Sequence, residues 1–281
     1  MLQTLKNAWK IPELRKKLLF TLFILLIYRL GSVIPVPFID VTTLANYFDS
    51  VLSSTILGLY NAMSGSAFSR ATVLALGIQP YINASIIIQL LTVAIPALER
   101  LAKDGGEDGK KKIERITRYT TVGLGLLMGW AYYMMLRNYS SQISIITSEG
   151  LLPALVIILA FTAGSALVMW LGEQINERGI GNGISLLIFG GIISRLPSAV
   201  HSTYLQMRTG DVGIVTVILF LVFALVVIIG IIEIQQGTRR IPVQYAKRVV
   251  GRKMYGGQST HIPMKVNQAG VIPVIFSLSL L

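Results

Sequence analysis

The sequence predicts an all-α protein that crosses a membrane several times. Of its 281 residues, 53% are hydrophobic and only 14% are charged, whereas a soluble domain carries about 25% charged residues. The mean hydropathy is +0.66, and the apolar residues gather in runs of the length that a bilayer requires, roughly 20 residues. These three observations exclude an ordinary soluble globular domain.

Six apolar runs are predicted to be membrane spans, and a seventh begins near the end of the chain. The seventh starts at about Ala269 and is still apolar at Leu281. These 13 residues are too few to cross a bilayer, so we expect the sequence to be cut inside a span. In chain order the six predicted spans are about 18–36, 78–95, 119–136, 151–171, 184–196 and 212–232.

Basic residues are distributed unevenly between the segments that connect these runs. With the N-terminus inside, the inside segments hold 20 of the 25 Lys and Arg residues. An excess of Lys and Arg on the cytoplasmic side is the usual signature of membrane topology. It explains most of the net charge of +12 without nucleic acid. The inside segments are 1–17, 97–118, 172–183 and 233–268.

The composition argues against a catalytic, metal or nucleotide site. The chain has no cysteine, and its two histidines, His201 and His261, are far apart in sequence. The glycine-rich segment 179–183 lacks the preceding strand and the Gly-Lys-Ser/Thr ending of a phosphate loop. Arg29 is the one charge clearly inside an apolar run, where snorkelling or pairing is the first interpretation and substrate contact the alternative. We therefore expect no enzyme and no cofactor.

The stretch 60–96 joins a polar segment to a predicted span, which is typical of a broken helix beside a cavity. Residues 60–70 are mostly small or polar, and Gly77 and Pro80 lie where the apolar run 78–95 begins. Non-helical backbone at membrane depth is tolerated only where it is buried in protein or lines a water-filled cavity. The stretch therefore predicts a pore or a transport site.

Isoleucines recur every four residues in the second and fifth predicted spans. Ile78 and Ile82 share one helix face, and Ile184, Ile188 and Ile192 share another, since residues four apart lie on one side of a helix. Lipid contact or ordinary packing explains most such isoleucines. The alternative is a hydrophobic constriction, which closes a pore by dewetting.

The inside segment 233–268 is long, basic and partly apolar. The alternation in 241–245, Ile-Pro-Val-Gln-Tyr, predicts a strand or ribbon. A long ordered loop in a compact protein is usually functional. Its composition suits docking to an acidic protein surface or to RNA.

Several blocks of the sequence resemble the SecY/Sec61α family of protein-conducting channels, and the resemblance covers the whole chain. This family has ten spans, arranged as two inverted halves of five around an hourglass pore. The resemblance implies a SecY-type inverted-repeat helical bundle, of which the chain supplies the first five-span half, the sixth span and the start of the seventh. The blocks are 28–37, 63–91, 169–185, 239–248 and 258–261.

The resemblance also implies roles for particular residues. The plug of the outer funnel, about 60–70, would contain Asn61, Met63, Ser64, Gly65, Ser66, Phe68 and Arg70. The ring at the waist of the pore would contain Ile78, Ile82, Ile188, Ile192 and Ile275. The docking surface would contain Arg239, Arg240, Tyr245, Lys247, Arg248, Arg252 and Lys253.

The implied organisation follows the spans. The second and third spans would form one side of a lateral gate into lipid. The segments are a cytosolic segment 1–17, a five-span half 18–196 with the cytosolic loop 97–118, an outer loop 197–211, a sixth span 212–232, a basic cytosolic docking loop 233–268 and a truncated seventh span 269–281.

The function implied by the resemblance is that of the pore-forming subunit of the Sec translocon. It would be a passive channel in the bacterial plasma membrane, with its N-terminus in the cytosol. Its partners would be the small membrane subunits SecE and SecG, the SecA ATPase or the ribosome, signal sequences and nascent polypeptides, and membrane lipid, with no direct nucleotide. The alternative is a secondary transporter, which also uses inverted repeats and broken helices.

Overall fold

The structure is a computed structural model, mostly helical, that describes residues 10–52, 55–140, 144–148, 150–243, 248–250, 253–255 and 260–267. The chain forms two compact units, residues 1–199 and residues 200–281. Each unit is described below by itself.

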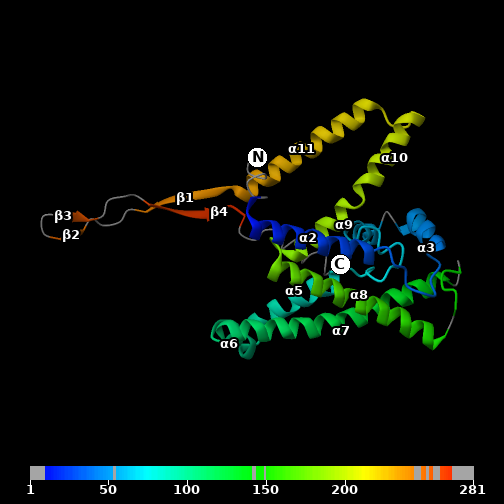
Figure 1. Ribbon diagram of the computed structural model, residues 1–281, viewed down its shortest axis with the longest axis horizontal. Helices are drawn as coiled ribbons and strands as arrows, with labels where there is room; N and C mark the ends of the chain where they lie inside the picture. The colour runs from blue at the N-terminus through cyan, green and yellow to red at the C-terminus, as the bar shows by residue number, and fades with distance from the viewer. Residues whose placement is uncertain are drawn as a thin grey trace. The chain divides into compact units, whose positions relative to one another are not determined.

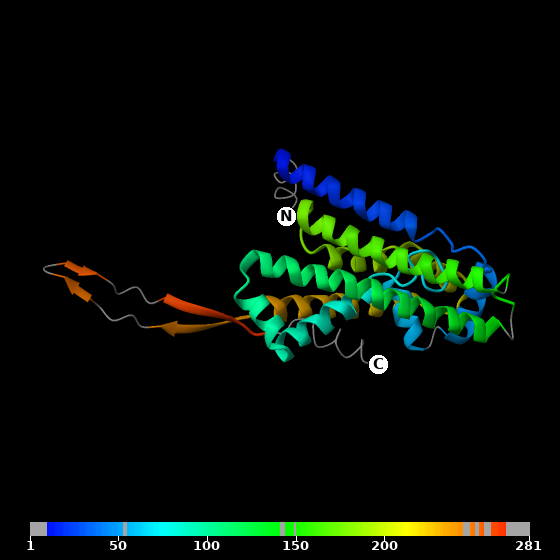
Figure 2. The ribbon, with the colours of Figure 1, turned by 90° about the horizontal axis from the view of Figure 1, so that it is seen from below.

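The first unit is a helical bundle in which α7 packs against both α5 and α8. Figures 1 and 2 both show α7 and α8 side by side along most of their length. Its helices are α2 (Pro12–Gly31), α3 (Val41–Tyr47), the π-helix η1 (Phe48–Leu52), α4 (Ile56–Met63), α5 (Gln79–Ala94), α6 (Pro96–Lys103), α7 (Gly106–Ser140), α8 (Leu151–Arg178) and α9 (Gly183–Ile193).

Capping residues and prolines explain several of the helix boundaries. The Asp40 side chain accepts hydrogen bonds from the backbone N–H groups of Thr42 and Thr43 and so caps α3, which is a preferred role of Asp. The Asn182 side chain caps α9 in the same way. Pro96 restricts Ile95 to an extended conformation (φ −109°, ψ 113°), and α5 and α6 consequently meet at 101°.

Three helical stretches among the described residues are long and apolar enough to cross a membrane, and the bent pair α5–α6 makes a fourth if it counts as one span. The three are α8, the stretch Gly183–Thr209 that holds α9 and α10 (Leu196–Thr209), and α11 (Ile214–Gln236). The first and third predicted spans form helices, α2 and α7, but do not meet this criterion. The reason is composition, since α2 carries Arg and Lys at its start and Arg29 near its end, and the apolar half of α7 is rich in Gly, Thr and Tyr.

Two segments predicted as loops are largely helical. The predicted outer loop 197–211 is occupied by α10, which continues from the fifth apolar run. The predicted inner loop 97–118 holds α6 and the first turns of α7. An ion pair between Lys103 and Glu99, 2.7 Å long, supports α6 because residues four apart are neighbours on a helix.

The second unit combines α11 with two short antiparallel sheets. Thr238 lies opposite Lys265 in the first sheet, and Val243 lies opposite Thr260, so the segment predicted to be a ribbon is one (Figure 1). Of the predicted strand 241–245, the last two residues lie outside the described residues. The strands are β1 (Thr238–Val243) paired with β4 (Thr260–Lys265), and β2 (Arg248–Val250) paired with β3 (Lys253–Tyr255).

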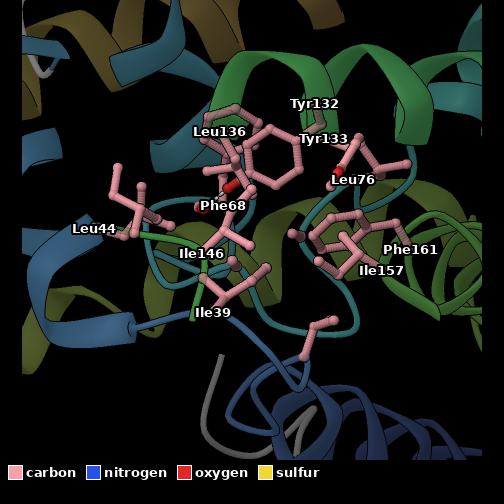
Figure 3. Close-up of a cluster of buried hydrophobic side chains, with 14 of the residues drawn as sticks. Ile39, Leu44, Phe68, Leu76, Tyr132, Tyr133, Leu136, Ile146, Ile157 and Phe161 are labelled. Carbon is pink, nitrogen blue, oxygen red and sulfur yellow. Dashed lines mark hydrogen bonds between the residues drawn. The ribbon is translucent and has the colours of Figure 1, made fainter. Parts of the chain in front are cut away.

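The core of the first unit contains a cluster of aromatic rings among aliphatic side chains and includes a residue of the predicted plug. Phe68, only 7% exposed, lies 4.6 Å from Tyr132 between ring centroids, and Tyr132 lies 4.9 Å from Phe161. The Tyr132 hydroxyl donates a 2.6 Å hydrogen bond to the Phe68 carbonyl oxygen. Figure 3 shows these rings together with Leu136, Ile146 and Ile157. The core therefore ties α7 and α8 to the segment that follows α4.

Candidate functional site

The predicted plug is a compact segment whose buried polar groups bond to one another. Asn61, 3% exposed, accepts a hydrogen bond from the Ser69 backbone N–H at its side-chain oxygen, over 3.0 Å. Its carbonyl oxygen accepts bonds from the Ser66 N–H and the Ser64 hydroxyl, and the Ser64 hydroxyl in turn accepts one from the Phe68 N–H. Buried polar groups need such partners, and here the segment supplies its own.

The first half of this segment is pressed against α9 at two glycines. Gly65 has a φ of +66°, and a Cβ there would lie 2.7 Å from the Gly191 carbonyl oxygen. A Cβ on Gly191 would lie 2.5 Å from the Met63 carbonyl oxygen. Both distances are shorter than any real Cβ contact, so this close approach of two backbones depends on glycine at both positions.

Arg29 contacts the same segment from α2. Its Nη1 donates a 3.4 Å hydrogen bond to the Gly65 carbonyl oxygen. This favours pairing over substrate contact as the role of the one charge inside an apolar run. Arg29 and Gly191 thus hold the plug from two different helices.

The second half of the predicted plug is fixed differently. Phe68 is part of the aromatic core, and the chain just after it is bonded to the loop that follows α2. The Val36 N–H donates to the Ala71 carbonyl oxygen over 3.1 Å, and the Val73 N–H donates to the Ile34 carbonyl oxygen over 2.9 Å. Arg70, by contrast, is exposed. The segment therefore has an anchored end at Phe68 and a seated end at Met63–Ser66.

The same loop is anchored at its other end by Asp40. Hydrogen bonds from the hydroxyls and backbone N–H groups of Thr42 and Thr43 lower the pKa of the Asp40 carboxyl to about 2. Its backbone N–H donates to the Ile145 carbonyl oxygen over 2.8 Å. The loop 32–40 is thus hydrogen-bonded both to the α7–α8 connection and to the anchored end of the plug, and it serves as the frame that holds them.

The structure brings part of the predicted ring together. Ile78 and Ile188 line one small cavity of about 20 Å³, and Met63 and Ser64 of the plug line it as well. Ile82, one turn along α5 from Ile78, is buried. Two members are not brought together with these: Ile192 is 52% exposed and does not line the cavity, and Ile275 lies outside the described residues.

The predicted docking residues lie on the ribbon as far as it is described. Arg239 and Arg240 are exposed on β1 and lie opposite Met264 and Pro263. In the described part of the ribbon neither arginine forms an ion pair. Arg248 begins β2 and Lys253 begins β3, whereas Tyr245, Lys247 and Arg252 lie outside the described residues.

A polar pocket of about 350 Å³ between α5, α6, α7 and α8 was not predicted from the sequence. Its lining includes an ion pair in which the Arg118 Nε donates to Glu173 over 2.7 Å. The spacings Ser85–Gln89 and Glu114–Arg118 were the available signal, since each pair shares a helix face. Within the described residues no group of three or more His, Cys, Asp or Glu is placed to hold a metal ion.

The helix α5, predicted to form part of a lateral gate, carries one further feature that sequence reasoning missed. The Asn83 side-chain oxygen is the one buried side-chain polar atom in the described part of the chain that has no hydrogen-bond partner. Its amide nitrogen lies 4.0 Å from the Met128 sulfur on α7. A buried, unpaired acceptor is costly, so this position is suited to a donor from outside the described residues.

The fold is that of a class of helical membrane channels. It is similar to the solved structure of a protein conducting channel, with a TM-score of 0.64 and 19% identity over 98% of this chain and 60% of that one. It is also similar to Sec61 in the canine ribosome-channel complex from the endoplasmic reticulum, with a TM-score of 0.62, 19% identity and the same two coverages. The predicted fold class is therefore confirmed.

Sequence comparisons with higher identity identify the family. The SecY family model matches residues 72–281. The chain is 47% identical over its full length to the protein translocase subunit SecY of Streptomyces scabiei and 42% identical to that of Aquifex aeolicus, and it spans 65% and 66% of their lengths. It is 45% identical to SecY of Buchnera aphidicola over 96% of this chain and 75% of that one. The chain belongs to the SecY family, as its resemblance predicted.

Proposed function

We propose that this chain forms part of the central pore of a Sec translocon, a passive channel for polypeptides that also releases membrane segments sideways into lipid. The observation that carries the proposal is the shared cavity of Ile78, Ile188 and the plug residues Met63 and Ser64. Apolar side chains under a removable polar segment are suited to a seal that opens for a chain of any sequence. The proposal is also supported by the name shared by the relatives, protein translocase subunit SecY.

The plug's construction supports a seal that opens and closes. Because its polar groups are bonded within the segment, its Met63–Ser66 end leaves few unpaired groups behind when it lifts from α9. The contacts that it must break include the Arg29 hydrogen bond, a hydrogen bond from the Gln79 amide to the Met63 sulfur and the packing at Gly191. A hydrogen bond from a charged group contributes about 1.5–3 kcal/mol, so a translocating chain needs to supply only a modest free energy to displace this end of the plug.

The energy for transport would come from partners. In this proposal the chain lies in the bacterial plasma membrane with its N-terminus in the cytosol, and the basic ribbon receives SecA or a ribosome. SecE and SecG would complete the channel. The positive-inside distribution of Lys and Arg supports this orientation, and the exposed arginines of β1 support the docking role.

The test is resting ion conductance in membrane vesicles that contain the variants Ile188→Ser and Gly191→Ala. Ile188→Ser hydrates the constriction, and Gly191→Ala pushes the plug off its seat, so both should raise the leak. The matched controls are Ile193→Ser, at an exposed isoleucine of the same helix, and Gly123→Ala, where a Cβ meets no atom within 4 Å. Conductance equal to that of the unaltered protein in both variants would refute the seal.

A further inference from the structure

A third cavity, of about 470 Å³, opens between the ends of α7 and α8 that are remote from the polar pocket. One wall is a single face of α7 that carries Trp130, Tyr133 and Arg137, spaced by three and four residues. The other wall is a single face of α8 that carries Leu151, Leu155 and Ile158, with the same kind of spacing. Because residues at these spacings share a helix face, the cavity is a groove that runs along both helices.

The groove is apolar along its length and charged at one end. Leu151 is 80% exposed, Leu155 50% and Trp130 52%. Large apolar side chains exposed together mark a contact with another molecule or with lipid, and α8 is apolar enough to span a membrane. Arg137 is the basic residue of the lining, and it forms none of the ion pairs found among the described residues.

The position of the charge fits the boundary between hydrocarbon and headgroups. Arg137 lies seven residues beyond Trp130, which is about 10 Å along a helix, so the groove reaches about a third of the way across a hydrocarbon core of roughly 30 Å. Tyr is enriched near this boundary, and Tyr133 lies one helical turn from Arg137. Arginine binds phosphate through paired hydrogen bonds.

We propose that this groove binds one anionic phospholipid, with the phosphate on the Arg137 guanidinium and an acyl chain between Trp130 and Ile158. The leaflet is the one opposite the basic segments of the chain. A partner's transmembrane helix fits less well, because a 10 Å length of helix with side chains fills roughly 800 Å³ and the groove offers about 470 Å³. The bound lipid would hold the ends of α7 and α8 together beside the anchored end of the plug.

The first experiment is native mass spectrometry of the delipidated protein titrated with phosphatidylglycerol or phosphatidylcholine. The unaltered protein should retain one phosphatidylglycerol in preference to phosphatidylcholine. Arg137→Gln should weaken phosphatidylglycerol binding about fivefold, the effect of one basic residue at an anionic headgroup, and Arg137→Lys should retain most of it. Arg208→Gln, which removes an exposed arginine of α10, is the matched control and should bind as the unaltered protein does.

Two further experiments distinguish a bound phospholipid from a site for free phosphate and from a contact with a partner protein. Ala154→Phe fills the groove and should weaken the binding of both lipids, while inorganic phosphate at equal concentration should not displace phosphatidylglycerol. A photo-crosslinking amino acid at Leu155, in native membranes, should label lipid. Equal binding of phosphatidylglycerol by the Arg137→Gln variant, displacement by inorganic phosphate, or a protein adduct at Leu155 would each overturn the proposal.

Discussion

The predicted plug, about 60–70, and the β1–β4 ribbon are both too polar to be membrane spans, yet they are held in different ways. The plug is mostly buried, and its side chains and backbone bond to one another. The described ribbon is exposed, and its two strands are held by backbone pairing. The plug is therefore stabilised by burial together with its own internal hydrogen bonds, and the ribbon by backbone pairing between its two strands.

The difference comes from the size and charge of the polar side chains. Ser, Asn and Gly are small enough to be buried once their hydrogen bonds are satisfied, whereas Arg and Lys are almost never fully buried without a partner. The plug accordingly suits a reversible seal. The ribbon keeps Arg239 and Arg240 in solvent, together with Ile241 and its cross-strand neighbour Ile262. It therefore presents charge and apolar surface together, which suits recognition of another macromolecule.

The prediction with the largest expected effect tests whether Phe68 anchors the plug. The substitution is Phe68→Ala. Phe68 stacks on Tyr132 in the core, so the truncation should lower the free energy of unfolding by about 3–5 kcal/mol, as Phe-to-Ala changes in cores do. The measurement is denaturant unfolding of the protein in detergent. Phe189→Ala, at a 56% exposed position of α9, is the control and should cost far less. Equal losses in the two variants would show that Phe68 is not an anchor.

The second prediction concerns the ribbon. Reversing the charges in the double variant Arg239→Glu, Arg240→Glu should leave the free energy of unfolding within about 0.5 kcal/mol, as surface changes usually do. It should weaken SecA or ribosome binding about tenfold, since two exposed ion pairs contribute up to about 1 kcal/mol each. Cosedimentation with reconstituted vesicles measures this binding. The Arg239→Lys, Arg240→Lys variant keeps the charge and is the control. If binding is unchanged in the reversed variant, the docking role is wrong.

The positions of the apolar helices and of the basic ribbon were largely predictable from the sequence. The packing that buries the plug was not. Apolar runs located α5, α8 and α11 well, because a span needs a minimum length of apolar residues. Helix continuation through 197–209 was missed, since that stretch mixes His, Ser and Arg into an apolar pattern. The anchoring of Phe68 was also missed. A single aromatic residue among small polar ones carries no periodic signal, and its partner Tyr132 is 64 residues away.

The smallest predicted effect is a pH dependence of stability that arises from Asp40. This residue ends the loop after α2 to which the anchored end of the plug is bonded. The pKa of Asp40 is lowered from 3.8 to about 2. A carboxyl with a lowered pKa in the folded state contributes stability that is present above pH 3.8 and is lost as the pH falls toward 2.

Asp40→Asn keeps an acceptor for the cap of α3 but cannot be protonated. Between pH 4 and pH 2 the unaltered protein should therefore lose slightly more stability than the variant, which thermal unfolding in detergent measures. Asp108→Asn, at an exposed carboxylate of α7, should follow the unaltered protein. A parallel decline of the Asp40→Asn variant would mean that the ionised form of Asp40 adds nothing to the stability of this loop, and that a neutral cap and the backbone pairing hold it equally well.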